Sequence, residues 1–393
     1  MNQNSSIFTD SVSLLDTLIA FDTTSRVSNL GLIEWVRDQL AALGIKSRLS
    51  FDASGGKANL FATIGEGSGG IVLSGHSDVV PTDGQAWSSD PFVARHADGR
   101  IYGRGTADMK GFIACALAAV PRALEHTLHR PLHIALTYDE EIGCIGVRTL
   151  LEDLAQAGIR PESCVVGEPT GMRPIIAHKG RQSFRCRVRG REAHSSLAPQ
   201  AVNAIEYAAR LIVRLQDFAR EEAQNGFRAE GFDIPFSTLA TGTIKGGIAS
   251  NVIPRDCEFT FEYRYLPGVD PDALVNNLKH YAATLEQEMR QIDTSCQIAF
   301  EQETHAASFD ATQHADFVNF ARTLCGQQSA SKVAYATEAG FFQRAGIATV
   351  VCGPGWITEA HRPDEFVEIS QLRRCDQFLA DLVASLQHLT PKK

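Results

Sequence analysis

The sequence has no pair of cysteines in C-x-x-C spacing and no long apolar run. Its 9 cysteines are scattered along 393 residues, which argues against a disulfide framework and against a thiolate zinc cluster. Free thiols are typical of the reducing cytoplasm. No run reaches the roughly 18 to 20 apolar residues that span a bilayer. The N-terminus lacks the basic segment of a signal peptide, and residues 12–21 predict an amphipathic helix instead. We therefore expect a soluble cytoplasmic protein without a membrane partner.

Positive charge and the common nucleotide and hydrolase motifs are also scarce. The chain has 37 Lys and Arg against 46 Asp and Glu, a net charge of −9, which argues against a nucleic-acid surface. It contains no Walker A, H-E-x-x-H or G-x-S-x-G motif. Residues 65–70 match G-x-G-x-x-G, but they lie between two strand candidates and open no helix, so we predict a hairpin turn there. These absences argue against a nucleotide-dependent enzyme.

What the chain does contain is an alternation of strand-like and helix-like segments. In the first half this rhythm predicts an α/β domain with a mostly parallel mixed sheet flanked by helices. After residue 180 the pattern changes to half-exposed strands with two helices, an α+β arrangement of the ferredoxin-like type. The α/β rhythm returns near residue 315. We predict a discontinuous first domain at 1–181 and 301–393, with a second domain inserted at 182–300.

Histidines and carboxylates gather just past five of the apolar segments. Parallel strands bring such ends to one crevice. Two histidines and three carboxylates, with no thiolate, suit a pair of zinc or similar divalent ions. One bridging carboxylate would give each ion three ligands. The sequence therefore predicts a two-metal site made of His76, Asp108, Glu141, Glu168 and His361.

Each of these residues also has an ordinary alternative. Asp108 could cap the helix that follows it, the acids at 139–141 could form a solvated loop, and His361 could be a surface histidine. Asp78 lies two residues after His76, where its carboxylate could accept the second imidazole N–H and fix the tautomer. Only the five residues taken together predict a metal site, because each one alone has an ordinary explanation.

These stretches resemble the M20 family of zinc metallopeptidases and amidohydrolases. The similarity covers essentially the whole chain and is carried by residues 74–81, 102–111, 137–141 and 167–170. The resemblance implies that Asp108 bridges two zinc ions, which cobalt or manganese could replace. One ion would add His76 and Glu168, and the other Glu141 and His361. It also implies that Glu140 is the general base and that Asp78 orients His76.

Within the family, the chain is most similar to the branch that deacetylates N-acetylornithine, a step of arginine biosynthesis. This similarity is carried by residues 177–180, 246–251, 264–268, 336–339 and 352–356. Relatives that remove a succinyl group carry Arg-Arg-Gly where this chain has His-Lys-Gly at 178–180, so we expect a small acyl group such as acetyl. The alternatives are hydrolysis of another N-acyl amino acid or of a dipeptide.

The resemblance also implies residues that contact the substrate. Asn251 and Arg264 are expected to hold its α-carboxylate, and Gly355 to lie in the substrate site. Glu338 is our candidate partner for the ornithine ammonium, although an acid at a helix N-terminus also complements the helix dipole. The second domain is expected to be a lid that forms a homodimer, with His194 reaching the partner subunit's active site to stabilise the oxyanion.

Overall fold

The computed structural model describes residue 8 and residues 10–388, and the chain divides into two compact units. The first unit comprises residues up to 177, 309–332 and the chain from 337 onward, and the second comprises 178–308 and 333–336. The predicted boundaries at 181/182 and 300/301 lie four and eight residues from the boundaries at 177/178 and 308/309. The reason is that strand β9 begins at Gly180 and strand β14 runs to Ala306, further than the alternating pattern indicated.

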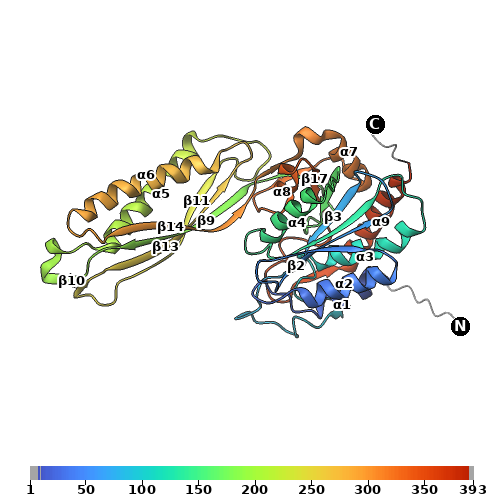
Figure 1. The fold of residues 1–393 in the computed structure, drawn as a ribbon, viewed down its shortest axis with the longest axis horizontal. Helices are drawn as coiled ribbons and strands as arrows, with labels where there is room; N and C mark the ends of the chain where they lie inside the picture. Colours follow the sequence, from blue (N-terminus) through green and yellow to red (C-terminus); the bar gives the residue numbers. More distant parts are fainter. Residues whose placement is uncertain (1–7, 9, 389–393) are drawn as a thin grey trace. The chain divides into compact units, whose positions relative to one another are not determined.

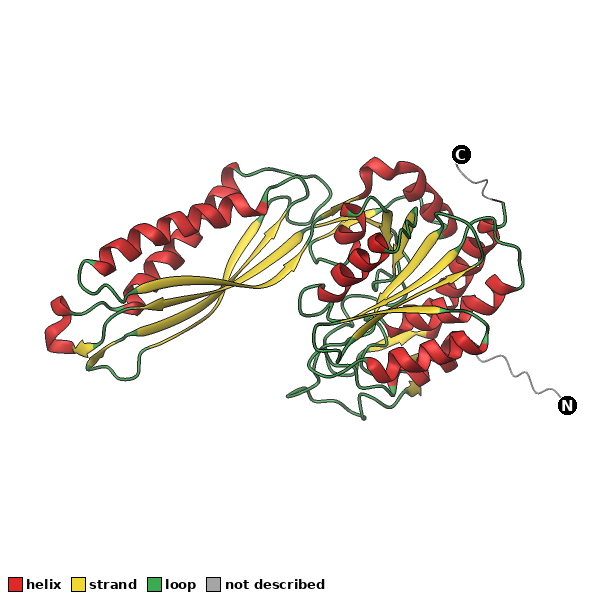
Figure 2. Cartoon of the chain, viewed as in Figure 1, coloured by secondary structure: helices red, strands yellow, loops and turns green. Residues whose placement is uncertain are grey.

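The first unit is built on a nine-stranded mixed sheet (Figure 1, Figure 2). Its order is β1-β2-β6-β3-β7-β17-β8-β15, with β16 pairing β8. Strand β3 is parallel to β6 and β7, and β17 is parallel to β7, whereas β2 is antiparallel to β1 and β6. The strands are β1 (Ser47–Phe51), β2 (Ala58–Ile64), β3 (Ile71–His76), β6 (Leu132–Thr137), β7 (Ser163–Val166), β8 (Ile175–His178), β15 (Phe309–Asp310), β16 (Ser331–Val333) and β17 (Ala348–Val351). This is the mostly parallel sheet that the sequence predicts.

Helices cover this sheet, and its central strands are buried throughout. Every residue of β3 and of β6 is buried, as expected for strands covered on both faces. Helices α1, α3 and α9 pack against one another, and α4 packs against α8 (Figure 1). The helices are α1 (Ser11–Ile19), α2 (Leu30–Ala42), α3 (Lys110–Leu124), α4 (Ile145–Gln156), α7 (Ala315–Leu324), α8 (Ala339–Arg344) and α9 (Ile369–Leu386). A small sheet adds β4 (Arg95–Ala97), β5 (Arg100–Tyr102) and β18 (Phe366–Glu368).

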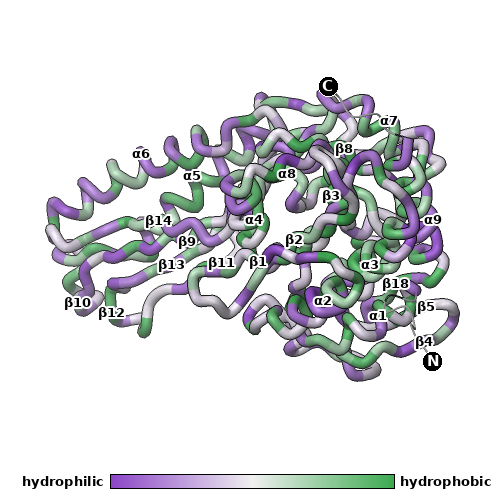
Figure 3. Tube along the Cα trace, turned by 45° about the vertical axis from the view of Figure 1, so that its right-hand side comes forward, coloured by the Kyte–Doolittle hydropathy of each residue, from purple (hydrophilic) through white to green (hydrophobic). Residues whose placement is uncertain are grey.

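The second unit is a four-stranded antiparallel sheet with two long helices. Its order is β11-β13-β9-β14, and its helices follow β9 and β13, which is the ferredoxin-like β-α-β-β-α-β arrangement. Alternate residues of β9 and β13 are buried and form a core with α5 and α6. Polar and apolar residues both recur along α5 and α6 (Figure 3), and the apolar ones pack into this core. The elements are β9 (Gly180–Arg189), α5 (Ala204–Asn225), β11 (Thr238–Gly246), β13 (Asp256–Tyr265), α6 (Pro271–Arg290) and β14 (Gln297–Ala306), with the short pair β10 (Ala193–His194) and β12 (Val252–Ile253).

The prediction of a hairpin turn at residues 65–70 is wrong. Strands β2 and β3 flank this segment, but β6 lies between them in the sheet and pairs with both. The partner strand is about sixty residues further along the chain, so the local pattern did not reveal it. Gly70 has φ +88°, and a Cβ there would lie 2.2 Å from the carbonyl oxygen of Pro131. Glycine is therefore needed for close packing, and the segment does not open a helix.

Among the residues that the structure describes, no helix combines the length and apolar content required to cross a membrane.

Candidate metal centre

The carboxyl ends of the central strands bring the predicted ligands together. His76 is the last residue of β3, Glu141 follows β6, and Glu168 follows β7. Asp108 lies in the loop before α3, and His361 in the loop after β17. Because β3, β6, β7 and β17 run parallel to a neighbour, their carboxyl ends share one edge of the sheet. The convergence that the sequence predicts for these five residues is therefore present.

Asp108 lies between the two histidines and offers one carboxylate oxygen to each. Its Oδ1 is 2.9 Å from His76 Nε2, and its Oδ2 is 3.3 Å from His361 Nε2. Glu168 Oε1 is 3.9 Å from His76 Nε2, while Glu141 Oε2 is 3.1 Å from His361 Nε2. The residues thus form two groups that share Asp108, and in each group the ligand atoms lie within 4.8 Å of one another. This is the geometry of a bridging carboxylate with two further ligands on each side.

The charges of this cluster fit a pair of cations. Burial raises the pKa of Glu168 well above its ordinary value, and burial together with the Asp108 charge raises that of Glu141. Hydrogen bonds to Asp108 and Glu141 raise the pKa of His361 to about 11. The direction of these shifts favours protons held by the imidazoles and by the buried acids of the cluster. Divalent ions can take the place of these protons, since neutral imidazole and carboxylate are good ligands for zinc-like metals.

The alternative in which Asp108 caps helix α3 is wrong. The N-cap residue of α3 is Met109, and it has no side-chain cap bond. Both carboxylate oxygens of Asp108 instead face the histidines. The peptide bond between Asp108 and Met109 is cis. The contacts of its two carboxylate oxygens are what orient Asp108 toward the histidines.

The first of the three consecutive acids has a different partner from the other two. Asp139 forms an ion pair with Lys57 and is 7% exposed. Glu141 faces His361, and the pKa of Glu140 is raised well above its ordinary value, chiefly by burial. Asp139 is buried and Glu140 and Glu141 are half-buried, so the three acids do not form the fully solvated loop of the alternative. One lysine neutralises Asp139, which leaves Glu140 and Glu141 for the site.

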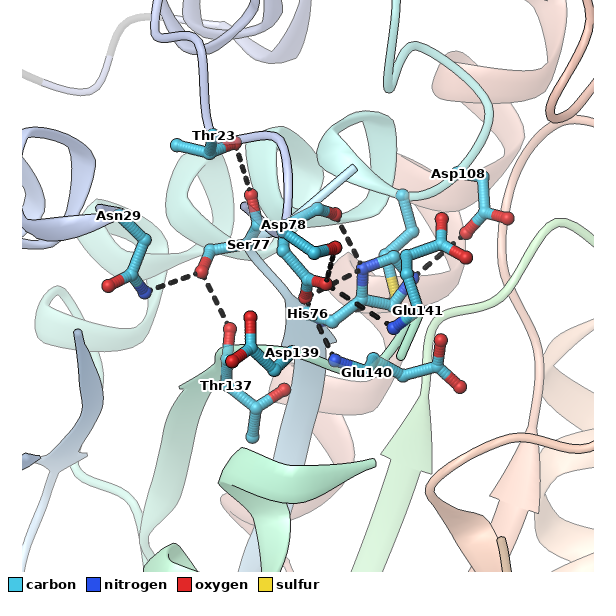
Figure 4. Close-up of polar contacts among 12 residues, drawn as sticks. Thr23, Asn29, His76, Ser77, Asp78, Asp108, Thr137, Asp139, Glu140 and Glu141 are labelled. Carbon is cyan, nitrogen blue, oxygen red and sulfur yellow. Dashed lines mark hydrogen bonds and ion pairs between the residues drawn. The ribbon is translucent and has the colours of Figure 1, made fainter. Parts of the chain in front are cut away.

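Asp78 connects the histidine at the end of β3 to the two glutamates after β6 (Figure 4). Its backbone carbonyl oxygen accepts a hydrogen bond from His76 Nδ1 at 2.8 Å, whereas its carboxylate is 3.7 Å from that nitrogen. The carboxylate accepts the backbone N–H groups of Glu140 at 3.0 Å and of Glu141 at 3.3 Å. We predicted that the Asp78 carboxylate orients His76. In this structure the closest contact between Asp78 and the His76 ring is made by the backbone carbonyl of Asp78. The Asp78 carboxylate instead accepts hydrogen bonds from the backbone N–H groups of Glu140 and Glu141.

Ser77 fixes the two strand ends to each other. Its hydroxyl donates to the carbonyl oxygen of Thr137 at 2.6 Å and accepts from Asn29 Nδ2 at 2.9 Å (Figure 4). Thr23 Oγ1 in turn donates to the carbonyl oxygen of Ser77 at 2.6 Å. These bonds hold the end of β3 against the end of β6. The relative positions of His76 and the two glutamates are thereby set by buried hydrogen bonds.

Two glycines that the sequence did not single out bring the loops after β7 and β17 close together. A Cβ on Gly167 would lie 1.9 Å from the ring of Phe112, and a Cβ on Gly353 would lie 2.0 Å from the carbonyl oxygen of Gly167. Glu168 therefore follows a position where only glycine fits. A glycine immediately before a predicted ligand was the available signal.

Two of the predicted substrate residues lie in the first unit. Gly355 has φ +83°, and a Cβ there would lie 3.2 Å from the Cβ of Ala107, the residue before Asp108. Glu338 directly precedes α8 and is 1% exposed, and burial raises its pKa to about 7. A substrate ammonium would reach Glu338 only after neighbouring side chains moved. Its role as the partner of that ammonium stays a prediction.

The remaining predicted residues, His194, Asn251 and Arg264, lie in the second unit. His194 on β10 pairs with Val252, and the Ser195 N–H donates to the carbonyl oxygen of Asn251 at 3.0 Å. Arg264 is near the far end of β13, where its guanidinium bonds to Glu262 at 2.5 Å and to the carbonyl oxygen of Ala334 at 3.2 Å. His194 and Asn251 are therefore adjacent, and Arg264 lies apart from them.

Comparison with known proteins places this arrangement among related enzymes. Residues 72–385 match the family described as Peptidase family M20/M25/M40. An acetylornithine deacetylase of Pasteurella multocida is 36% identical, with 94% of this chain and 96% of the relative covered. An acetylornithine deacetylase of Myxococcus xanthus is 38% identical, with the same coverage of 94% and 96%. Among solved structures, an M20 family metallo-carboxypeptidase of Sulfolobus solfataricus has a TM-score of 0.74 at 18% identity, covering 99% of this chain and 100% of that one.

Proposed function

The chain belongs to peptidase family M20/M25/M40, and from this premise we propose that it hydrolyses the amide bond of N-acetyl-L-ornithine to L-ornithine and acetate. Family members are metal-dependent hydrolases, and the bridged pair of ligand groups around Asp108 is the observation that carries the proposal. The near full-length relatives that are acetylornithine deacetylases support the choice of substrate. The reaction would serve arginine biosynthesis.

We propose that the five ligands hold two zinc ions, which cobalt or manganese could replace. Asp108 would be shared, with His76 and Glu168 on one side and Glu141 and His361 on the other. Such ions supply Lewis acidity toward the acetyl carbonyl and lower the pKa of water toward 7. The donor set of two imidazoles and three carboxylates supports this assignment, because it is the oxygen- and nitrogen-rich set that catalytic zinc prefers.

Within this site Glu140 would be the general base and then the general acid. Its carboxylate takes the proton of the attacking water and later gives it to the leaving α-amine. Asp78 supports this role by holding the Glu140 N–H at 3.0 Å. A donor such as His194 would stabilise the oxyanion of the tetrahedral intermediate.

We further propose that the active protein is a homodimer formed through the second unit. Eight residues of extended strand separate the start of β13 at Asp256 from Arg264, a span of roughly 26 Å at about 3.3 Å per residue. Asn251 precedes that strand and Arg264 lies near its end, a separation that favours contacts to the α-carboxylate from two different chains. A second copy that contributes His194 and Asn251 to this chain's site would satisfy both predicted roles.

The segment at residues 178–180 supports acetyl over succinyl as the group removed. His178 is buried, and burial lowers its pKa to about 4, so its ring is neutral at pH 7. The ammonium of Lys179 donates to the carbonyl oxygen of Phe236 at 2.5 Å. Neither side chain offers the planar double donor that arginine provides for a carboxylate.

The substrate assignment is tested with a panel of amides. We expect kcat/KM for N-acetyl-L-ornithine to exceed that for N-succinyl-diaminopimelate by roughly 10- to 100-fold, because a carboxylate left without its partner costs about 1–3 kcal/mol or more. The measurement is the rate of acetate or succinate release, with N-acetyl-L-methionine and a dipeptide as further substrates. A faster rate on the succinyl compound or on the dipeptide would replace this proposal by the corresponding alternative.

All nine cysteines are free thiols, which supports a reducing compartment such as the cytoplasm as the place of the reaction.

A further inference from the structure

A buried ion pair lies directly behind the bridging aspartate. Arg104 and Glu365 are each 1% exposed and are 261 positions apart in the chain. Arg104 Nη1 donates to Glu365 Oε2 at 2.5 Å. A buried ion pair adds little stability by itself, because the loss of hydration offsets the attraction between the charges. The contacts that this pair makes with the metal ligands give it a specific role.

Glu365 holds the backbone that carries Asp108. Its Oε1 accepts the N–H of Ala107 at 2.9 Å and the N–H of Asp108 at 3.1 Å. Its other oxygen accepts from Arg104, so both carboxylate oxygens are used. A carboxylate is needed here, because both of its oxygens face N–H donors. In an amide, one oxygen is replaced by an NH₂ group, which would face either the two backbone N–H groups or Arg104 without an acceptor.

Arg104 extends the connection to the second histidine through Gln85. Arg104 Nη2 donates to Gln85 Oε1 at 2.5 Å, and Gln85 Nε2 donates to the carbonyl oxygen of His361 at 2.9 Å. Trp87 Nε1 also donates to Gln85 Oε1 at 3.0 Å, which fixes the orientation of this amide. The His361 side chain is 50% exposed, so its position depends on contacts to its own loop.

We propose that Glu365, Arg104 and Gln85 form a positioning network that sets the distance between the bridging carboxylate of Asp108 and the imidazole of His361. This inference rests on the proposed two-metal site. Glu365 acts on Asp108, which both ions would share, whereas Gln85 acts on His361, which only one ion would contact. The two ends of the network should therefore affect metal binding differently.

The test is a titration of the metal-free protein with Zn²⁺ in competition with a chromophoric chelator. We expect Gln85→Ala to weaken one of the two binding steps about 10- to 100-fold, the usual effect of removing a group that orients a ligand, and to leave the other step unchanged. We expect Glu365→Gln to weaken both steps. Gln156→Ala, an exposed glutamine at the end of α4, is the matched control and should change neither.

The outcomes separate this inference from the proposed function. If the unaltered protein shows two binding steps and Gln85→Ala leaves both unchanged, or weakens both equally, the proposed network is wrong, and the two-metal site still stands. A failure of the unaltered protein to bind two ions would overturn the two-metal site itself. If Glu365→Gln does not fold, Gln85→Ala still decides, because it keeps the Arg104–Glu365 pair. The unfolding temperature of metal-free Gln85→Ala should fall only slightly, because Arg104 Nη2 and Trp87 Nε1 lose a shared acceptor, and a large fall together with equal weakening of both binding steps would indicate a purely structural role.

Discussion

Replacement of Glu140 by glutamine is expected to reduce the turnover of N-acetyl-L-ornithine by about 10²- to 10⁴-fold, the usual contribution of general acid–base catalysis. Glutamine has nearly the same shape but can neither accept the proton of the attacking water nor return it to the leaving amine. The backbone N–H of residue 140 would still bond to Asp78, so the loop and the metal ligands should keep their positions. The metal content should stay at that of the unaltered protein.

The control is Glu152→Gln, which makes the same chemical change at an exposed acid of α4 and should leave turnover unchanged. Steady-state acetate release and metal analysis are measured on the same preparations. A Glu140→Gln variant with full activity would show that another group is the base. A variant that is inactive because it has lost its metal would make Glu140 a ligand.

Replacement of Asp108 by asparagine is expected to have the largest effect on metal binding. Asp108 contacts both histidines, at 2.9 Å and 3.3 Å, and both ligand groups include it. An asparagine keeps one acceptor oxygen but loses the negative charge and the second oxygen. Both ions should therefore bind more weakly, and acetate release should fall below detection at metal concentrations that saturate the unaltered protein.

Asp139→Asn is the matched control for this change. Asp139 is also a buried acid near the site, but its partner is Lys57. We expect this variant to bind metal as before and to unfold at a lower temperature, because a half-buried lysine loses its counter-ion. If Asp108→Asn kept both ions and Asp139→Asn lost them, the assignment of the bridge would be wrong.

The sequence alone predicts that these five residues lie together, because the rule that brings them to one place is simple. His76 ends a buried strand, Glu141 and Glu168 each follow one, and the carboxyl ends of parallel strands lie at one edge of the sheet. The division into one bridge and two pairs did not follow from that rule. It came from the resemblance to a known family, and the distances around Asp108 agree with it.

Features that depend on distant partners were not predictable in the same way. Residues 65–70 were read as a hairpin, because nothing local shows that β6 lies between β2 and β3. The contact between the Asp78 carboxylate and the Glu140 N–H joins residues 62 positions apart. Arg104 lies inside a recognised motif and Glu365 lies outside them, and their pairing across 261 positions has no signature in a single sequence. Their charges next to metal ligands were the only available indication.

The central claim is that these five residues hold two divalent ions on which hydrolysis of N-acetyl-L-ornithine depends. The most direct test is to strip the protein of metal with a chelator and to add Zn²⁺ back in measured equivalents, while bound metal and acetate release are recorded together. We expect negligible acetate release from the stripped protein and recovery that is complete when two ions are bound per chain. Full acetate release from the metal-free protein, or none from protein holding two ions, would contradict it.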